Sequence, residues 1–353
     1  MKADQRSLIR RINSAHDLAE HGLIAPEKTG DIEKTQNNFA IGLSPHLAKL
    51  IRTQPDNTAL VKQYIPDIRE LEFTKTELQD PIGDEAHTPV KGIVHRYPDR
   101  VLFKIAHACA VYCRYCFRRE MIGLKGNGLT KDEIGDALDY IKSHKGIQEV
   151  ILTGGDPLIL SPRKIKAVLK ELEATEHVRI VRIHSRIPIA DPERLSEELI
   201  TALKAFKKPV YLVVHINHSD EINAVVKEKC SELHHAGCTL LSQSVLLRGV
   251  NDNAAALENL FRDLIALHIK PYYLHHPDKA LGTGHFRLPL KEGMKIYQSL
   301  LGRLTGIALP SYMLDIPGGH GKIPINHSFV EELGKGSYRI RDYKGKMHLY
   351  SDD

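Results

Sequence analysis

Hydrophobic and polar positions repeat in a regular order over residues 101–274. Short apolar runs, typical of buried strands, alternate with longer stretches whose apolar residues recur at helical spacing. The predicted strands are residues 101–106, 149–153, 178–184, 210–216, 239–246 and 270–274. The predicted helices between them are residues 131–144, 162–174, 193–206, 222–236 and 255–267.

This alternation predicts an α/β fold in which a parallel sheet is covered by helices on its outside. Six strand–helix units, rather than eight, indicate a partial, TIM-like (β/α)6 barrel. The chemistry of such barrels lies at the carboxyl ends of the strands. We therefore expect functional side chains just after each predicted strand.

The segments on either side of the barrel pattern differ from it. Ile9 and Ile12 have helical spacing, and Ser44 followed by Pro45 is a typical helix start. The tail of the chain alternates around a turn at 344–345, which predicts a β-hairpin. The chain is thus divided into a helical N-terminal region over residues 1–95, the barrel over 96–310, and a C-terminal extension with a lysine-bearing loop and the hairpin over 311–353.

Composition and charge narrow the class of protein. The 353 residues are 42% hydrophobic and 26% charged, which is ordinary for a globular protein with one barrel-sized domain. The net charge of +5 is mild and the basic residues are scattered, so we expect no nucleic-acid partner. No apolar run of about 18 residues occurs, so we expect no membrane span. Five cysteines, three of them in one loop, indicate a reducing compartment and a cytoplasmic location.

Those three cysteines are the strongest chemical signal. Cys109, Cys113 and Cys116 are spaced C-x3-C-x2-C directly after the first predicted strand. Thiolates bind zinc, copper and iron–sulfur clusters. A closed zinc site takes four ligands, so three cysteines leave one metal position open. On a 4Fe–4S cluster, that open iron can bind a small molecule through amino and carboxylate groups. His107 as the fourth ligand of a zinc site is the alternative.

Polar residues also follow the later strands. Gly154, Gly155 and Asp156 come after the second strand, where missing side chains let backbone approach a ligand closely. The alternative is an ordinary turn between strand and helix. A single histidine at a strand end is more often structural than a ligand, but several polar strand ends directed at one mouth indicate a site. The others are His184, Arg186, His215 and Gln243.

A glycine-rich segment near the C-terminus ends in Lys322. It is not a phosphate-binding loop of the G-x-x-x-x-G-K-[ST] type, because Ile316 stands at the first glycine and Ile323 at the Ser or Thr position. A lysine delivered by a flexible loop suits a Schiff base to an aldehyde cofactor. The alternative is a solvated surface lysine.

Taken in order, the cysteine loop, the Thr-Gly-Gly-Asp-Pro turn and the Pro-Gly-Gly-His-Gly-Lys segment resemble the lysine 2,3-aminomutase family over residues 92–325. The resemblance implies a radical S-adenosylmethionine (SAM) barrel that holds a 4Fe–4S cluster, SAM and pyridoxal 5′-phosphate (PLP).

The resemblance also implies roles for particular residues. Cys109, Cys113 and Cys116 match the ligands of three irons, and Lys322 matches the lysine that binds PLP. Guanidinium groups suit phosphate and carboxylate oxygens. The remaining matches are Gly154, Gly155 and Asp156 at the methionine end of SAM; Arg96 and Arg100 at the PLP phosphate; His215 and Gln243 around the two cofactors; Arg118 at the substrate carboxylate; and Asp278 and Asp315 at the distal ammonium of lysine.

The chain departs from the longer family members at one point. Those members carry a zinc site built partly from a cysteine after a Gly-Val-Asn-Asp segment, where this chain has Asn253, and no cysteine follows Cys238. Zinc is therefore not expected, and the departure puts the family's usual oligomeric contacts in doubt, although a homo-oligomer is compatible with the sequence. The short form resembles the branch that makes β-lysine for modification of elongation factor P.

The resemblance implies an isomerase that converts L-α-lysine to β-lysine and takes electrons from a donor such as flavodoxin or ferredoxin. One alternative is an aminomutase for arginine or glutamate; a glutamate enzyme should lack anions at Asp278 and Asp315. An alternative of another class is a zinc scaffold or an electron-transfer iron–sulfur protein.

Overall fold

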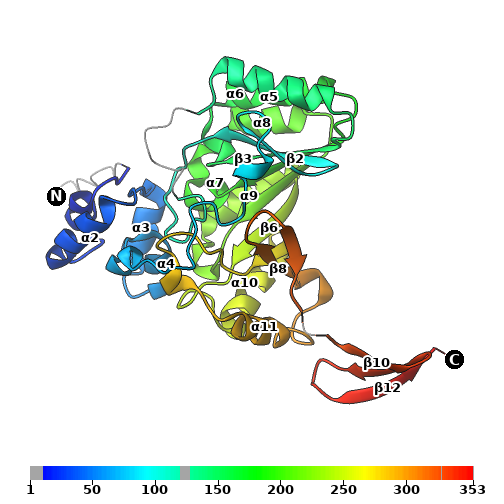
Figure 1. Cartoon of the computed structure of the whole chain (residues 1–353). Helices are drawn as coiled ribbons and strands as arrows, with labels where there is room; N and C mark the ends of the chain where they lie inside the picture. The colour runs from blue at the N-terminus through cyan, green and yellow to red at the C-terminus, as the bar shows by residue number, and fades with distance from the viewer. Residues whose placement is uncertain (1–10, 120–127, 327, 353) are drawn as a thin grey trace.

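The computed structural model describes residues 11–119, 128–326 and 328–352 and is built around one nine-stranded sheet (Figure 1). Strands β2 to β8 run parallel, and β1 and β9 pair antiparallel at the two ends of the sheet. The strands are β1 Ile93–Tyr97, β2 Arg100–Ala106, β3 Glu149–Gly154, β4 Ile180–Ser185, β5 Val210–His215, β6 Thr239–Val245, β7 Ile269–His275, β8 Ser311–Ile316 and β9 Gly321–Pro324.

The predicted partial barrel is confirmed, and β2 to β7 are the six predicted strands, each within two residues of its expected bounds. The helices that follow them lie outside the sheet (Figure 1). In α6, for example, Ser161 caps the helix, Pro162 opens it, and the buried apolar residues fall on one stripe facing the sheet. These helices are α5 Lys131–Ser143, α6 Pro162–Ala174, α8 Glu197–Ala205, α9 Ala224–His235 and α10 Ala254–Ala266; α7 Ile187–Ala190 is a single short turn and α11 Leu290–Gln298 follows β7.

The region before the barrel is largely helical and has its own apolar core. Ser44 accepts a hydrogen bond from the Leu47 amide and starts a helix, as predicted. Ile12 does not lie in a helix but pairs with Leu43 in an isolated β-bridge, so the helical spacing was misleading there; residue 9 lies outside the described residues. The helices are α1 Ala15–Glu20, α2 Thr29–Gln36, α3 Pro45–Thr53 and α4 Thr58–Tyr64.

The glycine-rich segment is a hairpin between β8 and β9, not the flexible loop expected from the sequence. Gly318 and Gly319 have positive φ angles of 86° and 83°, which L side chains rarely adopt, and they form the turn. In this hairpin Asp315 pairs with Lys322 across the two strands. Lys322 is therefore part of strand β9, and the pairing of β9 with β8 fixes the position of its backbone.

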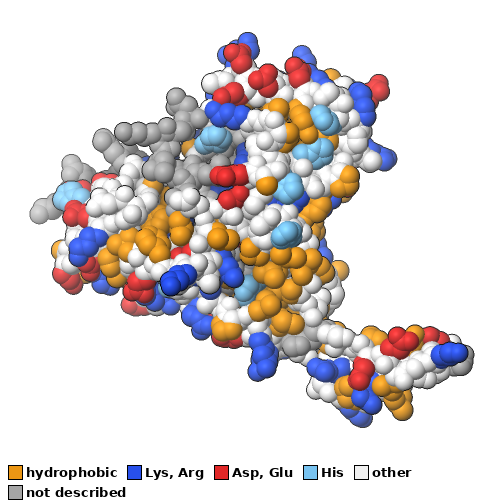
Figure 2. Space-filling view, viewed as in Figure 1, with side chains coloured by type: hydrophobic (Ala, Val, Ile, Leu, Met, Phe, Trp, Pro, Cys, Tyr) orange, Lys and Arg blue, Asp and Glu red, His pale blue; other side chains and the backbone are white. Residues whose placement is uncertain are grey.

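A second, three-stranded sheet projects from the barrel at the C-terminus (Figures 1 and 2). Its last two strands form the predicted hairpin around Gly345, and one strand was not predicted. Several large apolar side chains on it are exposed, including Leu349 at 81%. Its strands are β10 Val330–Gly334, β11 Ser337–Arg341 and β12 Met347–Ser351.

Across the described ranges, we find no helix with the length and apolar character needed to cross a bilayer.

Candidate active site

A cavity of about 540 Å³ lies at the carboxyl ends of the parallel strands, where barrel chemistry is expected. It gathers every candidate residue that the sequence singled out for a cofactor or substrate. Their proximity agrees with one shared site, while their individual roles stay predictions. The candidates that line it are Arg96, Arg100, Cys109, Cys113, Cys116, Arg118, Gly154, Gly155, Asp156, His215, Gln243, Asp278, Asp315 and Lys322.

The cysteine loop forms one wall of this cavity and is fixed by backbone hydrogen bonds. The Tyr112 amide donates to the Gly42 carbonyl at 2.8 Å, and the Arg114 amide donates to the Gln63 carbonyl at 2.9 Å. Both acceptors belong to the N-terminal region. That region therefore serves to position the loop, although the sequence showed no catalytic pattern in it.

Two arginines of the loop are structural. Arg114 and Arg119 are buried, and both donate to the buried carboxylate of Glu70, Arg114 Nε at 2.8 Å from Oε1. The charges of the two guanidiniums hold the pKa of Glu70 below its usual range, although burial alone would raise it. Buried charges need such partners.

The glycines after β3 allow this turn to pack directly on the cysteine loop. A Cβ on Gly154, whose φ is 112°, would lie 2.3 Å from the Ala106 carbonyl oxygen. A Cβ on Gly155 would lie 2.3 Å from the Ala108 carbonyl oxygen. The close approach predicted at these glycines therefore involves the chain's own backbone, as well as the cavity that both residues line.

The side chain of Asp156 is fixed by hydrogen bonds within the chain. Its carboxylate accepts hydrogen bonds from the Ser185 hydroxyl at 2.8 Å and from the amides of Arg186 and Ile187 at 2.7 and 3.1 Å. It also accepts from the Leu158 amide at 3.0 Å. The carboxylate is thus occupied in joining the ends of β3 and β4. It lines the cavity and shapes it, but its hydrogen bonds are made within the chain.

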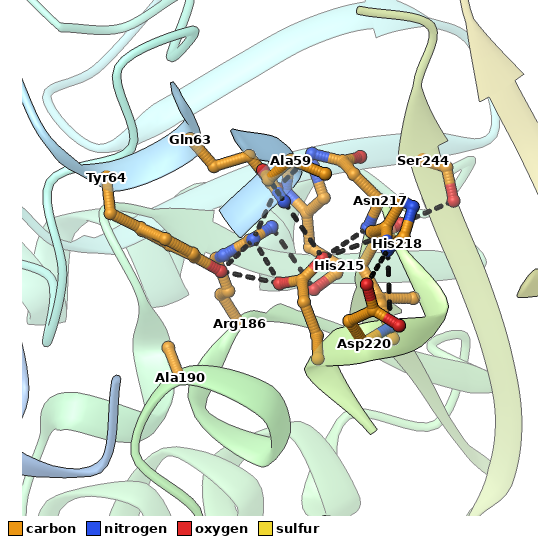
Figure 3. A network of polar contacts seen from close by, with 12 residues as sticks. Ala59, Gln63, Tyr64, Arg186, Ala190, His215, Asn217, His218, Asp220 and Ser244 are labelled. Atoms are coloured by element: carbon orange, nitrogen blue, oxygen red, sulfur yellow. Dashed lines mark hydrogen bonds and ion pairs between the residues drawn. The ribbon is translucent and has the colours of Figure 1, made fainter. Parts of the chain in front are cut away.

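A buried polar network ties the N-terminal region to the ends of β4 and β5 (Figure 3). The Arg186 Nη2 donates to Glu221 Oε2 at 2.7 Å and to Gln63 Oε1 at 3.0 Å, and it also contacts the Tyr64 hydroxyl. Asn217 Nδ2 donates to the same Gln63 oxygen at 3.0 Å. Sequence reasoning noted Arg186 as a polar strand end but missed Gln63, Tyr64 and Glu221, because no spacing links residues so far apart.

Some buried polar atoms of the cavity wall have no hydrogen-bond partner among the described residues. They include the Tyr115 hydroxyl and the Nε2 atoms of His184 and His215. Burial lowers the pKa of both histidines well below its usual value, so both imidazoles are neutral at physiological pH. An unpaired buried polar group is costly, so these atoms favour a polar ligand in the cavity.

Lys322 lies at the opposite wall. Its Nζ is 2.7 Å from Asp315 Oδ2 and 3.5 Å from His275 Nδ1, and its backbone amide donates to the Tyr97 hydroxyl at 3.0 Å. Its ammonium also lies 5.7 Å from the centre of the Tyr273 ring, which stacks on Tyr272. A lysine on a cavity wall beside stacked aromatic rings can hold a flat aldehyde cofactor, and a solvated surface lysine has no such neighbours.

Asp278 and Asp315 share the cavity but differ in charge. Burial and the neighbouring Asp315 raise the pKa of Asp278 to about 7. Burial also opposes the charge on Asp315, yet the hydrogen bond from His275 and the charge of Lys322 hold its pKa below the usual range. Near neutral pH Asp315 is therefore negatively charged, whereas Asp278 is only partly ionised. A cation bound beside the pair would favour the ionised form of Asp278.

Asp84, a buried acid on the cavity wall that the sequence did not reveal, pairs with two arginines of the cavity and with Lys104. Its carboxylate lies 2.9 Å from Arg118 Nη2, 3.4 Å from Arg96 Nη2 and 3.9 Å from Lys104 Nζ. The Nε atoms of both arginines are buried without a partner among the described residues. Three cations against one anion leave a positive excess, which suits anionic groups such as phosphate and carboxylate. Arg100 lies at the rim and pairs with Asp99 at 2.7 Å.

The three cysteines fit the iron–sulfur cluster, one of the three groups that the resemblance implies. Three thiols on one wall suit a cluster, because each thiolate of a cluster binds a separate iron. Within the described parts of the chain, no three metal-binding side chains gather around a single ion site. His107, considered as a fourth zinc ligand, is not among the residues that line the cavity with the cysteines.

Comparisons with known proteins show the family to which the chain belongs. Residues 103–260 match the model of the radical SAM superfamily. The L-lysine 2,3-aminomutase of Fusobacterium nucleatum is 35% identical over 97% of this chain and 80% of that protein. The L-lysine 2,3-aminomutase of Methanococcus maripaludis is 38% identical over 92% of this chain and 75% of that protein. The glutamate 2,3-aminomutase of Clostridioides difficile is 32% identical over 98% of this chain and 82% of that protein.

Proposed function

Because the chain belongs to the lysine 2,3-aminomutase family of the radical SAM superfamily, we propose that it is an isomerase that moves the 2-amino group of L-lysine to carbon 3 and so makes β-lysine. Membership implies three bound groups, a 4Fe–4S cluster, SAM and PLP. When bound, they supply the radical that activates the substrate and the carbonyl that carries the migrating nitrogen.

The chain's own residues bind the cofactors, orient the substrate and neutralise the charges of both. Cys109, Cys113 and Cys116 would hold the cluster, and Lys322 would hold PLP. The positive excess around Asp84 supports anion binding by the neighbouring arginines. The other proposed contacts are Arg96 and Arg100 with the PLP phosphate; Arg118 with the substrate carboxylate; and Gly154, Gly155, Asp156, His215 and Gln243 around SAM, with Asp156 acting through the turn that it fixes.

The observation that carries the substrate proposal is the pair of acids in the cavity, Asp278 and Asp315. A distal ammonium that pairs with carboxylates gains charge-assisted hydrogen bonds of about 1.5–3 kcal/mol each. Asp315 already pairs with an ammonium here, that of Lys322. The side-chain carboxylate of glutamate would be repelled by the same pair. Arginine, which also ends in a cation, is the second candidate.

The cellular role follows the same proposal. The cluster needs a reducing partner, for which we propose flavodoxin or ferredoxin. The three thiol ligands support a location in the reducing cytoplasm. Asn253, which stands where longer family members carry one cysteine of their zinc site, supports the zinc-free branch that supplies β-lysine for elongation factor P. A homo-oligomer is compatible with this role.

The function is tested by incubating the reconstituted, reduced protein with labelled lysine, arginine and glutamate in separate reactions. We expect β-lysine from lysine and no product from glutamate. Conversion of glutamate or arginine in place of lysine would show that the substrate is wrong. A zinc scaffold or an electron carrier would make no β-amino acid, and its properties would not depend on Lys322.

A further inference from the structure

The outer side of the cysteine loop faces a second cavity, of about 430 Å³. This outer cavity is formed by the start of the described chain, the end of α2 and the loop itself. Cys109 lines both the outer cavity and the barrel cavity. The cysteine loop is therefore a thin wall with the substrate space on one side and the protein surface on the other.

Exposure along this wall is confined to one residue. Within residues 107–119, all of which the structure describes, Ala108 alone is exposed, and the others are buried or half-buried. Ala108 lines the outer cavity and is bonded directly to Cys109. Ala108 thus brings exposed surface within one peptide bond of Cys109, a proposed ligand of the cluster.

The described surface around Ala108 is polar. Among the described residues that line the outer cavity, Arg11 is the one that carries a charge, and its Nη2 donates to the Cys109 carbonyl at 2.6 Å. Amide side chains supply much of the remaining polar surface, among them the exposed Asn37 and Asn38. Neither asparagine side chain makes a hydrogen bond to the described residues, so both are available to a partner.

We propose that this surface is the docking site of the electron donor, a small redox protein with an acidic rim. The donor places its one-electron carrier against Ala108 and gives one electron to the cluster held by the three cysteines. The donor is oxidised by one electron and the cluster is reduced by one. This inference rests on the proposed function, because it presupposes the cluster.

The barrel side does not offer the same route. Its cavity holds the candidate residues for SAM, PLP and substrate, and a folded protein does not enter a space of about 540 Å³. A donor that docks on the outer side can reduce the cluster while the substrate cavity stays closed to water. The positive charge of Arg11 favours an acidic partner, because complementary charge speeds encounter.

The test is the double variant Asn37→Asp/Asn38→Asp, which places two negative charges on the docking surface without touching the proposed catalytic residues. Its matched control is Gln148→Glu/Gln298→Glu, which adds the same charge elsewhere; Gln148 precedes β3 at the opposite end of the barrel. The readout is the rate of cluster reduction, followed by absorbance in rapid mixing with reduced flavodoxin or ferredoxin. Photoreduced deazaflavin, a small neutral reductant, reports whether the cluster is intact.

We expect the Asn37/Asn38 variant to be reduced by the protein donors roughly tenfold more slowly than the wild type at low salt. The difference should shrink at 1 M salt, where the Debye length is about 3 Å. Reduction by deazaflavin should be unchanged, and the control should match the wild type with every reductant.

An unchanged rate with both protein donors in the Asn37/Asn38 variant would overturn the docking site, as would failure of both donors to reduce the wild type. The affinity of the cluster-free protein for flavodoxin, measured by calorimetry, should fall in the same variant. Failure of the proposed function is seen separately, as a wild type that deazaflavin reduces but that makes no β-lysine.

Discussion

Asp84 shows how one residue sets the electrostatics of the cavity. It is the shared partner of Arg96, Lys104 and Arg118, and the side chains of all four are 7–12% exposed. Removing one partner of a buried ion pair leaves the others uncompensated, which typically costs about 3–5 kcal/mol. We expect Asp84→Asn to lower the free energy of unfolding by that order, measured by urea denaturation.

The matched control is Asp99→Asn, which removes a more exposed carboxylate paired with Arg100. Exposed pairs contribute about 0–1 kcal/mol, so its stability should stay close to that of the wild type. If the two variants were equally stable, Asp84 would not hold the cations. Asp84→Asn should also raise the KM for lysine, because Arg118 loses its partner and its orientation.

Asp278 predicts a pH dependence of stability. Its pKa rises to about 7 in the folded protein, above the usual value of 3.8. A carboxyl with a raised pKa binds its proton more tightly when folded, so its contribution to stability falls as pH rises from about 4 to 7. Asp278→Asn removes this penalty. We expect the free energy of unfolding of the variant to exceed that of the wild type by more at pH 8 than at pH 5. Urea denaturation at both pH values measures the two differences.

The same substitution should impair the reaction. Without the charge of Asp278, the substrate ammonium loses one partner, and lysine turnover should fall by at least roughly tenfold, about 1.4 kcal/mol. A variant that is more stable but less active would identify Asp278 as a binding group. An equal gain at pH 5 and pH 8, with wild-type turnover, would contradict both expectations.

Among the elements, the turn after β3 is the one whose packing is most restricted. A Cβ on Gly155 would lie 2.3 Å from a backbone oxygen of the cysteine loop, which cannot give way as a side chain would. Overpacking of this kind costs about 1–3 kcal/mol. We expect Gly155→Ala to lower the melting temperature and the iron bound per chain.

Gly135→Ala is its control. Gly135 lies in helix α5 with nothing within 4 Å of its Cβ position, and alanine stabilises a helix by about 0.5–1 kcal/mol relative to glycine. That variant should melt slightly higher and bind the same amount of iron. Full iron binding by Gly155→Ala would show that the cysteine loop does not depend on this contact.

The elements that sequence could predict are those with a regular local pattern. The strands β2 to β7 and their helices were found because short apolar runs and helical spacing of apolar residues are local patterns. The strands β1, β8 and β9 were missed, the last two because glycines in their turn suggested a loop. The candidate site was found through motifs, whereas Asp84 and the partners of Arg186 were not, because their contacts join residues far apart in sequence.

At the scale of the whole molecule, the two edge strands of the barrel sheet, β1 and β9, do not pair with each other but are joined by a side-chain hydrogen bond. Tyr97 on β1 and Lys322 on β9 belong to the two edges of the sheet, and the Tyr97 hydroxyl accepts a hydrogen bond from the Lys322 amide. We expect Tyr97→Phe to cost about 1 kcal/mol and to weaken PLP binding, measured by cofactor titration. Tyr343→Phe, at an exposed position in the turn between β11 and β12, should change neither, and equal effects of the two variants would argue against this contact.

The same junction has a consequence for how the protein is made. The residues that it joins are 225 positions apart, and Lys322 lies in β9, the last strand of the barrel sheet. During synthesis the N-terminal parts of a chain fold first, so the cysteine loop and the units from β2 to β7 can assemble on the ribosome before β9 has emerged. The proposed PLP pocket gains its second wall only after β9 has been synthesised. We therefore expect the barrel to bind PLP only once all nine of its strands have left the ribosome.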